Sequence, residues 1–424
     1  MNPEQLLAHF DRISDAPDAI PRLRRFILDL AVRGKLIEQD PKDEPASELL
    51  KRIQAEKARL VKEGKIGPEK SPIHASADEL VFELKPGWQA ARISQIIVEL
   101  QTGPFGSSLH QSDYQKGGIP VINPASIKNE RLIPVESMAV GPKTLERLAT
   151  FKLRAGDIVM ARRGEMGRCA VVTEQEDGWL CGTGSLILRL PECVFSRFLV
   201  TLIGSPFARE YLDGSAVGAT MQNLNQSILL SLIIGLPPLA EQHRIVAKVE
   251  ELMALCDRLD AAKAERESRR DRLAASSLHR LNNGTDPDGF RDHARFYFNQ
   301  LPRLTTKPEH IQQLRKTILD LAVSGKLVPQ DPNVVPVAIA DIPLAKKSDG
   351  RVLDDNPEDN AGPYNIPESW RWYRLGAISQ HITDGEHATP PRIIEQQVPL
   401  VTAKNVRNGF MDYDDTDWVS FETA

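Results

Sequence analysis

The chain has 424 residues, of which 53 are Lys or Arg and 58 are Asp or Glu, so its net charge is −5. This length predicts two or three domains, and the charge balance excludes a protein that binds nucleic acid through a global basic excess. The four cysteines have no metal-binding or redox spacing, which indicates reduced thiols in a cytoplasmic protein. We expect neither a signal peptide nor a membrane span, because residues 1–18 are polar and the longest apolar run, Ile228–Ala240, contains Ser, Gly and two prolines.

Residues 1–85 are expected to form a helical region followed by a linker. Apolar residues at helical spacing predict an amphipathic helix over Pro21–Arg33, with Gly34 just beyond its end. A second helix is expected over Pro45–Glu63. The polar segment Gly64–Pro86, which contains three prolines, has the composition of a linker.

Residues 86–238 are predicted to be a mixed α/β domain. Short apolar runs bounded by Gly and Pro indicate strands, and they are followed by a helix over Ser196–Leu212 and a polar, Gly-rich loop over Gly214–Gln226. The expected strands are Ile119–Ile122, Asp157–Ala161, Cys169–Thr173 and Ser185–Leu190.

One long helix is expected from Leu239 to about Leu281. Its apolar residues alternate at spacings of four and three, which is typical of a coiled-coil seam: Ile245, Val249, Leu252, Cys256 and Leu259. We expect this seam to pack against Ile27 and Leu30 of the N-terminal helix, or against the repeat of that helix at Leu314, and the composite to bind other subunits. The helix is expected to end at Asn282–Gly289, and Asn333–Pro367 is a second, acidic linker.

An internal repeat organises the chain. Leu23–Pro41 and Leu314–Pro332 are identical at 14 of 19 positions with an offset of 291. Later segments match at offsets of 282 and 279, so that Asn129 corresponds to Asn408. The pattern indicates a duplicated large module with loops of unequal length.

The second copy of the module is shorter than the first. Residues 239–366 are expected to hold the long helix, the repeated segment and a linker, and residues 367–424 the start of a second domain. The second module offers only 55 residues from Trp370, against about 150 in the first, so we expect a truncated domain that lacks most of a core.

The sequence lacks the motifs of several enzyme classes. There is no phosphate-binding P-loop, no H-E-x-x-H and no G-x-S-x-G. Asn123–Ser126 (NPAS) lacks the second proline and the aromatic residue of the amino-methyltransferase tetrapeptide, so a turn at a strand end is favoured. The segment Gly182–Gly184 is also expected to be a turn. A standalone methyltransferase or nuclease is therefore the weaker hypothesis, beside a DNA-binding protein and a protein-only helical adaptor.

Basic and amide side chains are the candidate DNA-binding residues. Five basic residues within 17 positions give a local charge of +3, and arginine suits bidentate contact with guanine or phosphate; a solvated surface patch is the alternative. The amides of Thr220–Gln226 could pair with adenine or cap the backbone, and Phe105–Gln111 is a third polar loop. The candidates are Lys152, Arg154, Arg162, Arg163, Arg168, Gln222, Asn223, Asn225, Ser107, Ser108 and Gln111.

Taken together, these segments resemble the specificity subunits of Type I DNA restriction–modification enzymes. The resemblance covers almost the whole chain. It is carried by the duplicated LR-x-x-ILDLAV-x-GKL-x-x-QDP segment and by the LPPLAEQ segment that leads into the long helix. Further matches are Gly87-Trp88-x-x-x-Arg92, Gly103–Ser107, Gly118–Ile122, Leu153–Arg168 and Asn223–Asn225.

The resemblance implies an α+β architecture: target recognition domains joined by long antiparallel, coiled-coil-like helices. Each domain would read half of a bipartite DNA site, and the helices would set the spacing and dock the modification and restriction subunits. The chain itself would carry no catalytic residue, cofactor or metal. S-adenosylmethionine, ATP and Mg²⁺ would be bound by the partner subunits.

The length of the chain and the charge of its domain qualify that expectation. The chain ends inside the second domain, so it is expected to read one half-site, or to pair with a second copy. The segment Gly87–Leu239 has 14 basic and 13 acidic residues, a net charge of +1. Because phosphate contacts dominate nucleic-acid affinity, we expect weak DNA binding without the modification subunits.

Overall fold

The structure, a computed structural model, describes residues 16, 18–67, 75–105, 108–214, 224–284, 287–335, 362–379, 388–407 and 409–424. The chain divides into two units, residues 1–266 and 267–424, and each is described by itself.

The first unit combines helices with short strands. Its helices are α3 (Ala19–Val32), α4 (Ala46–Lys62), α5 (Ile93–Ile96), α6 (Pro142–Arg147), α7 (Ser196–Ile203), α8 (Pro206–Gly214), α9 (Gln226–Ser231) and the first part of α10 (Leu239–Asn283). Its strands are β1 (Gln89–Arg92), β2 (Glu99–Thr102), β3 (Tyr114–Gln115), β4 (Ile119–Ile122), β5 (Ile127–Lys128), β6 (Arg131–Leu132), β7 (Ala139–Val140), β8 (Ile158–Ala161), β9 (Cys169–Val171), β10 (Leu180–Cys181), β11 (Ser185–Arg189) and β12 (Ile233–Leu236).

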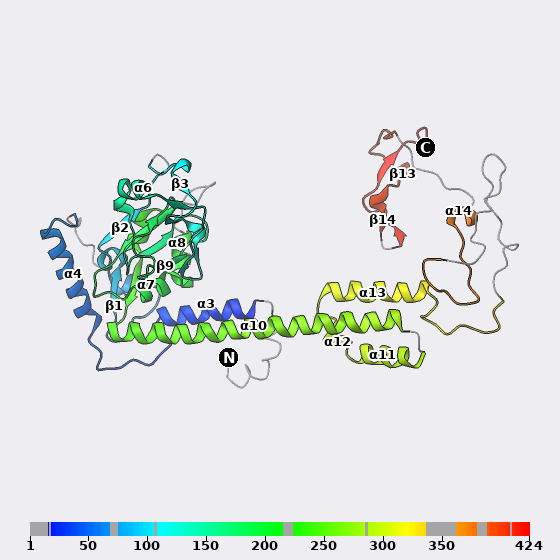
Figure 1. Ribbon diagram of the computed structural model, residues 1–424, viewed down its shortest axis with the longest axis horizontal. Coiled ribbons are helices and arrows are strands. Elements are labelled where there is room, and N and C mark those ends of the chain that lie inside the picture. Colours follow the sequence, from blue (N-terminus) through cyan, green and yellow to red (C-terminus); the bar gives the residue numbers. More distant parts are fainter. Residues whose placement is uncertain are drawn as a thin grey trace. The chain divides into compact units, whose positions relative to one another are not determined.

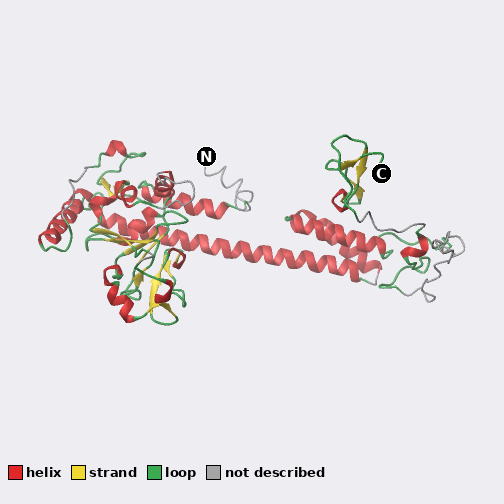
Figure 2. Ribbon diagram, turned by 90° about the horizontal axis from the view of Figure 1, so that it is seen from above, coloured by secondary structure: helices red, strands yellow, loops and turns green. Residues whose placement is uncertain are grey.

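An antiparallel four-stranded sheet, in the order β2-β11-β8-β9, forms the centre of the domain (Figure 2). Alternate residues of β8 point to opposite faces, as expected for a strand. Ile158 and Met160 pack in one apolar cluster with α7, whereas Val159 and Ala161 pack in another with β4. Both faces of this sheet are therefore covered, which explains why every residue of β8 is apolar and why Leu186, Ile187 and Leu188 form the middle of β11. A second sheet, β10-β4-β7-β3, lies beyond it.

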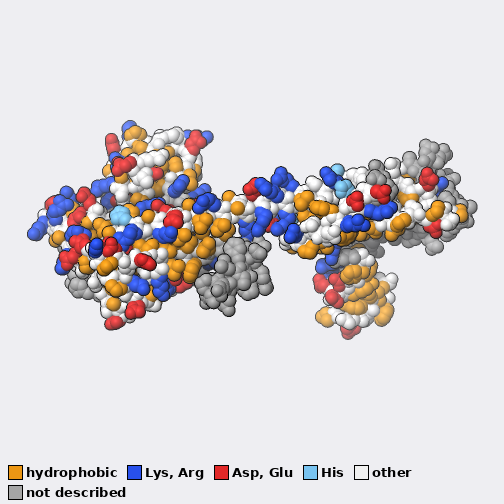
Figure 3. Space-filling view, turned by 90° about the horizontal axis from the view of Figure 1, so that it is seen from below, with side chains coloured by type: hydrophobic (Ala, Val, Ile, Leu, Met, Phe, Trp, Pro, Cys, Tyr) orange, Lys and Arg blue, Asp and Glu red, His pale blue; other side chains and the backbone are white. Residues whose placement is uncertain are grey.

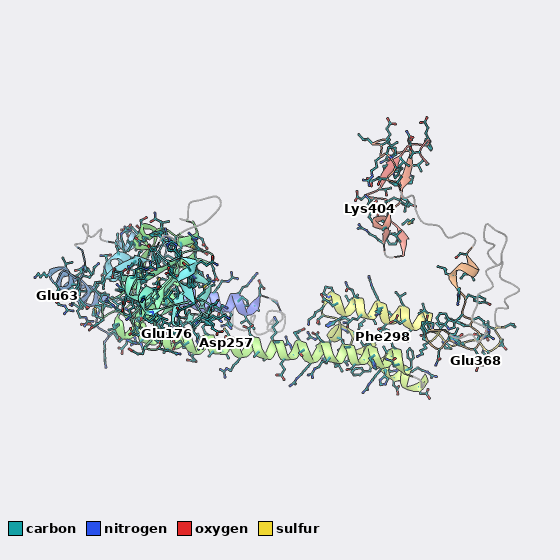
Figure 4. The ribbon with its side chains drawn as sticks, turned by 45° about the horizontal axis from the view of Figure 1, so that its top comes forward. Glu63, Glu176, Asp257, Phe298, Glu368 and Lys404 are labelled. Atoms are coloured by element: carbon teal, nitrogen blue, oxygen red, sulfur yellow. The ribbon has the colours of Figure 1, made fainter. Side chains whose placement is uncertain are left out.

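Helix α3 lies antiparallel to the first part of α10 (Figure 1). Arg24 on α3 pairs with Asp257 at 2.7 Å and Asp260 at 3.0 Å, whereas Asp43, further along the chain, pairs with Arg244 at 2.6 Å. Figure 4 marks Asp257 on α10 beside α3. The expected packing of the long helix against the N-terminal helix is confirmed.

This packing corrects one part of the sequence-based prediction. Ile27, Ile245, Val249 and Cys256 are buried in the core of the unit, and Leu252 and Leu30 are half-buried. Contacts within the chain bury most of the seam, so little of it is left accessible to another subunit. Leu259 alone among the predicted seam residues of α10 is exposed, at 41%.

Two predicted boundaries also change. The helix expected over Ser196–Leu212 is two helices, because Pro206 has no backbone N–H to donate and begins a new helix. The Ser205 hydroxyl accepts a hydrogen bond from Ala208 N at 3.3 Å and caps that helix. The loop expected to extend to Gly289 ends earlier, because a helix already begins at Pro287.

The second unit contains the last part of α10, which packs with the helices that follow it. These are α11 (Pro287–Asn299), α12 (Leu301–Leu304) and α13 (Pro308–Val323); α14 (Leu375–Ile378) and the strands β13 (Val398–Leu400), β14 (Val406–Arg407), β15 (Phe410–Met411) and β16 (Asp417–Val419) come later. Leu278, Tyr297 and Leu321 form the centre of its helical core.

The repeat predicted from sequence is structural. In the first module β4 pairs antiparallel with β7 so that Ile119 faces Val140; in the second, β13 pairs with β16 so that Val398 faces Val419. Both pairs of positions are offset by 279. The hairpins β5–β6 and β14–β15 also pair in one register, at the same offset of 279.

Candidate nucleic-acid interface

Several turns meet at one end of the central sheet. Gly103 N donates to Ser185 O, Arg162 N to Gly184 O, and Gly182 N to Ile122 O, each at 2.9 Å. These bonds join the ends of β2, β4 and β8 to the start of β11. We call the result the turn surface: Thr102–Phe105, Asn123–Ser126, Arg162–Gly164, Gly182–Gly184 and Leu224–Gln226.

Arg162 fixes the segment that precedes α9. Its Nε donates to Leu224 O at 2.9 Å, and Leu224 N donates back to Arg162 O at 3.0 Å. Leu224 is fully buried, so it anchors this segment against the sheet. The structure thus brings a predicted arginine against the end of the amide-rich loop. Gln222 and Asn223 lie outside the described residues.

The described amides of that loop have backbone and side-chain partners. Asn225 Oδ1 accepts from Ser227 N at 3.2 Å and caps α9, which is the capping role weighed as the alternative. Gln226 Nε2 donates to Thr102 Oγ1 at 2.8 Å. The Asn225 side chain is exposed, although its Oδ1 accepts the capping hydrogen bond.

Arg163 follows directly in an exposed turn. Gly164 adopts a positive φ of 80°, a conformation that favours glycine and lets the chain reverse after β8. The acidic residue of this turn, Glu165, forms an ion pair with Arg209 of α8. Arg168, at the far side of the turn, is half-buried, and its Nε has no hydrogen-bond partner among the described residues.

The five basic residues do not form one cluster, which corrects the sequence-based grouping. Lys152 and Arg154 precede the amino end of β8, beside Leu180 and Asp157, whereas Arg162 and Arg163 follow its carboxyl end. A four-residue strand separates the two groups by about 13 Å along its axis. Arg189, whose Nη2 donates to Lys152 O at 3.0 Å, lies at the same end as Lys152.

The third polar loop is held by an arginine. Ser108 O accepts a hydrogen bond from Arg147 of α6, and the Arg147 guanidinium also pairs with Asp113 at 2.9 Å. The backbone N–H of His110 and then Arg147 lower the pKa of the Asp113 carboxyl. Gln111 is exposed, and Ser107 lies outside the described residues.

Sequence reasoning missed Thr183 and Asn123. Thr183 Oγ1 donates to Pro104 O at 2.9 Å, and the Asn123 side chain lies against Gly182, where a Cβ would come within 2.2 Å of its Oδ1. The signal was present in Gly182-Thr183-Gly184. The two glycines allow this close approach of β11 to the turn after β4.

The described residues hold no cluster of three metal-ligating side chains. Burial raises the pKa of the Cys169 and Cys181 thiols far above the ordinary value, so both stay protonated.

Acidic and basic side chains are interspersed on the face of the first unit seen in Figure 3. The turn surface presents guanidinium, amide and hydroxyl groups on a backbone held by hydrogen bonds between its turns. Across the described part of the chain, no helix is long and apolar enough to cross a membrane.

Comparisons with known proteins agree with the resemblance seen in the sequence. Residues 86–266 match the family model described as the Type I restriction modification DNA specificity domain. Two curated relatives are specificity subunits of Type I restriction enzymes from Escherichia coli. The EcoAI subunit is 31% identical over 378 residues, which cover 85% of this chain and 62% of the relative. The EcoEI subunit is 30% identical over 383 residues, which cover 86% and 63%.

A solved structure, that of the HsdS subunit from Thermoanaerobacter tengcongensis, is 19% identical with a TM-score of 0.34, over 62% of this chain and 53% of that one. The turn surface lies within residues 86–266, the part of the chain that matches the Type I DNA specificity domain. Most of the chain is similar to Type I restriction–modification specificity subunits, as the sequence motifs indicated. It spans 62–63% of the length of the two curated relatives.

Proposed function

We propose that this chain is a non-catalytic DNA-reading subunit of a Type I restriction–modification complex, and that residues 86–266 read one half of a bipartite site through the turn surface. The observation that carries the proposal is the double hydrogen bond between Arg162 and Leu224. It holds Arg162 against Leu224, at the described end of the amide-rich segment, and Arg163 follows directly. Arginine and amide side chains are the groups best suited to read base edges in the major groove.

The charge of the domain indicates how it would act. With 14 basic and 13 acidic residues over Gly87–Leu239, it has little attraction for the phosphate backbone as a whole. The subunit would therefore bind DNA weakly alone and depend on cytoplasmic modification subunits that close around the duplex. S-adenosylmethionine, ATP and Mg²⁺ would belong to the modification and restriction subunits.

Binding of a fluorescent mixed-sequence duplex, followed by anisotropy at low salt, tests the surface. Arg162→Ala and Arg163→Ala are compared with Arg154→Ala, an exposed arginine at the other end of β8. Loss of a phosphate contact should weaken binding to all sequences and reduce the salt slope by about one. Loss of a base contact should cost about 1–3 kcal/mol on the cognate half-site only.

Equal affinities for wild type, R162A and R163A, on mixed and cognate DNA alike, would show that the turn surface does not contact DNA. The cognate sequence comes from the methylome of cells that express the subunit with its modification partner. A single half-site motif would indicate one DNA-reading domain, and a bipartite motif would indicate two. A symmetric motif would indicate a pair of chains.

Partner subunits need a docking surface outside the buried seam of α10. Leu255 and Leu259 of α10 are each 41% exposed and lie one helical turn apart, so they form an apolar strip on the side of α10 away from the core. We place the modification subunit on this strip. The double variant Leu255→Glu/Leu259→Glu should abolish co-purification, with Asp257→Lys on the opposite, α3-facing side as the control. A protein-only adaptor predicts this loss too, but no DNA binding by any complex.

A further inference from the structure

Phe105 is an exposed aromatic side chain on the turn surface. It is 63% exposed, and among the described residues of the domain, 86–105, 108–214 and 224–238, no other aromatic ring is as accessible as 36%. The hydrophobic effect favours the burial of such a ring. Among the described residues of the domain, the one exposed aromatic ring thus lies beside the turn that carries Arg162 and Arg163.

The backbone under Phe105 is held on both sides. Gly103 N donates to Ser185 O and Ser108 N donates to Phe105 O, at 2.9 and 2.8 Å. The preceding carbonyl, that of the buried Pro104, accepts the Thr183 hydroxyl at 2.9 Å. A ring on such a support loses little conformational entropy when it binds a ligand, because its backbone is already fixed.

The loop of Phe105 is also next to the cationic turn. Thr183, which holds Pro104, is followed by Gly184, whose carbonyl accepts from Arg162 N at 2.9 Å. A Cβ placed on Gly184 would lie 3.8 Å from the Cδ of Arg163. The aromatic ring and the two arginines therefore flank the same turn.

We propose that Phe105 stacks on a base of bound DNA, as a ring inserted at an unstacked step of the duplex; the inference rests on the DNA-reading function proposed above. Apolar wedges of this kind unstack a base step while neighbouring cations hold the backbone. The hydrogen bond from the Thr183 hydroxyl to Pro104 O supports the loop that carries the ring.

Tryptophan fluorescence of the full chain, with Phe105→Trp and titration of a mixed-sequence duplex at low salt, tests the stack. A stacked base quenches the indole, so the change on saturation should exceed that of the wild type, which has five tryptophans. Val81→Trp is the control: Val81 is 75% exposed and adjoins Phe82, whose ring packs 5.4 Å from Phe207 of α8. It should show no extra quenching.

Affinity gives the second readout. Phe105→Ala should weaken duplex binding about tenfold, the order expected for one lost aromatic stack, and Phe105→Leu should fall between the two. If the wild type binds DNA and Arg163→Ala weakens it, while F105W is not quenched and F105A binds as well as wild type, the stacking proposal alone is wrong. If no duplex binds to the wild type or to its assembled complex, the DNA-reading function fails first.

Discussion

The indole Nε1 of Trp88 donates a hydrogen bond to Glu241 Oε2 at 3.0 Å in the buried interior of the first unit. The same carboxylate oxygen accepts Gln39 Nε2 at 3.3 Å. Gln39 belongs to the repeated segment, Trp88 to the start of the domain, and Glu241 to the first turn of α10. One buried side chain thus ties together the three motifs on which the family resemblance rests.

This network predicts a pH dependence. Burial raises the pKa of Glu241, so the folded state binds a proton more tightly than the unfolded state does, with its ordinary value of about 4.3. The contribution is fully favourable below that value and is lost as pH rises through the folded pKa. Urea unfolding from pH 4 to 7 should show a downward slope in the wild type that is reduced in Glu241→Gln. Superimposable slopes would show that this carboxyl does not titrate differently on folding.

The two copies of the repeat predict unequal costs for the same substitution. Ile27 is 4% exposed, whereas its counterpart Ile318 is 38% exposed. Truncation of a buried isoleucine costs about 2–5 kcal/mol, and an exposed one much less. Ile27→Ala should therefore lower the free energy of unfolding of the first unit by about 3 kcal/mol, and Ile318→Ala should change that of the second by under about 1 kcal/mol. Hydrogen exchange followed separately in the two units would measure both; equal losses would contradict the assigned burial.

The ion pairs of Arg24 should contribute little beside that burial. Its partners Asp257 and Asp260 have side chains that are 72% and 53% exposed. Exposed pairs are worth about 0–1 kcal/mol, so Arg24→Met should cost less than about 1 kcal/mol, with the loss shrinking further in 0.5 M salt. A cost comparable to that of Ile27→Ala would mean that charge pairing and not apolar contact holds α3 on α10.

The β5–β6 hairpin offers a stabilising substitution. Its turn residues Asn129 and Glu130 both have positive φ, 48° and 57°, and the second module has Gly409, with a φ of 82°, at the position of Glu130. Left-handed backbone costs a non-glycine residue about 1–2 kcal/mol, and less for asparagine. Glu130→Gly should raise the thermal midpoint, and Asn129→Gly should leave it nearly unchanged. A lower midpoint for E130G would show that the Glu130 side chain makes contacts worth more than the strain.

Local patterns in the sequence predicted the helices, the central strands and the repeat, because apolar periodicity directly reports which face of each element is buried. The partners of individual side chains could not be predicted from these local patterns. Residues 152 and 162 are close in sequence, yet β8 runs between them and places them at opposite ends of the sheet. Asn225 has the residue type of a base-reading side chain and of a helix cap, and only the position of α9 shows that it caps. Pro206 was visible, but a short helix on each side of it requires the packing of α7 and α8 on the core.

Amide hydrogen exchange of the full chain, with and without a saturating mixed-sequence duplex, tests whether the turn surface contacts DNA. Slower exchange is expected in the described segments of the turn surface, above all Arg162–Gly164 and Gly182–Gly184. Exchange around Lys152–Arg154 and the Thr173–Glu176 turn at the opposite end of the sheet should be unchanged. Protection confined to that opposite end, or bound DNA with no protection of the turn surface, would contradict such contact.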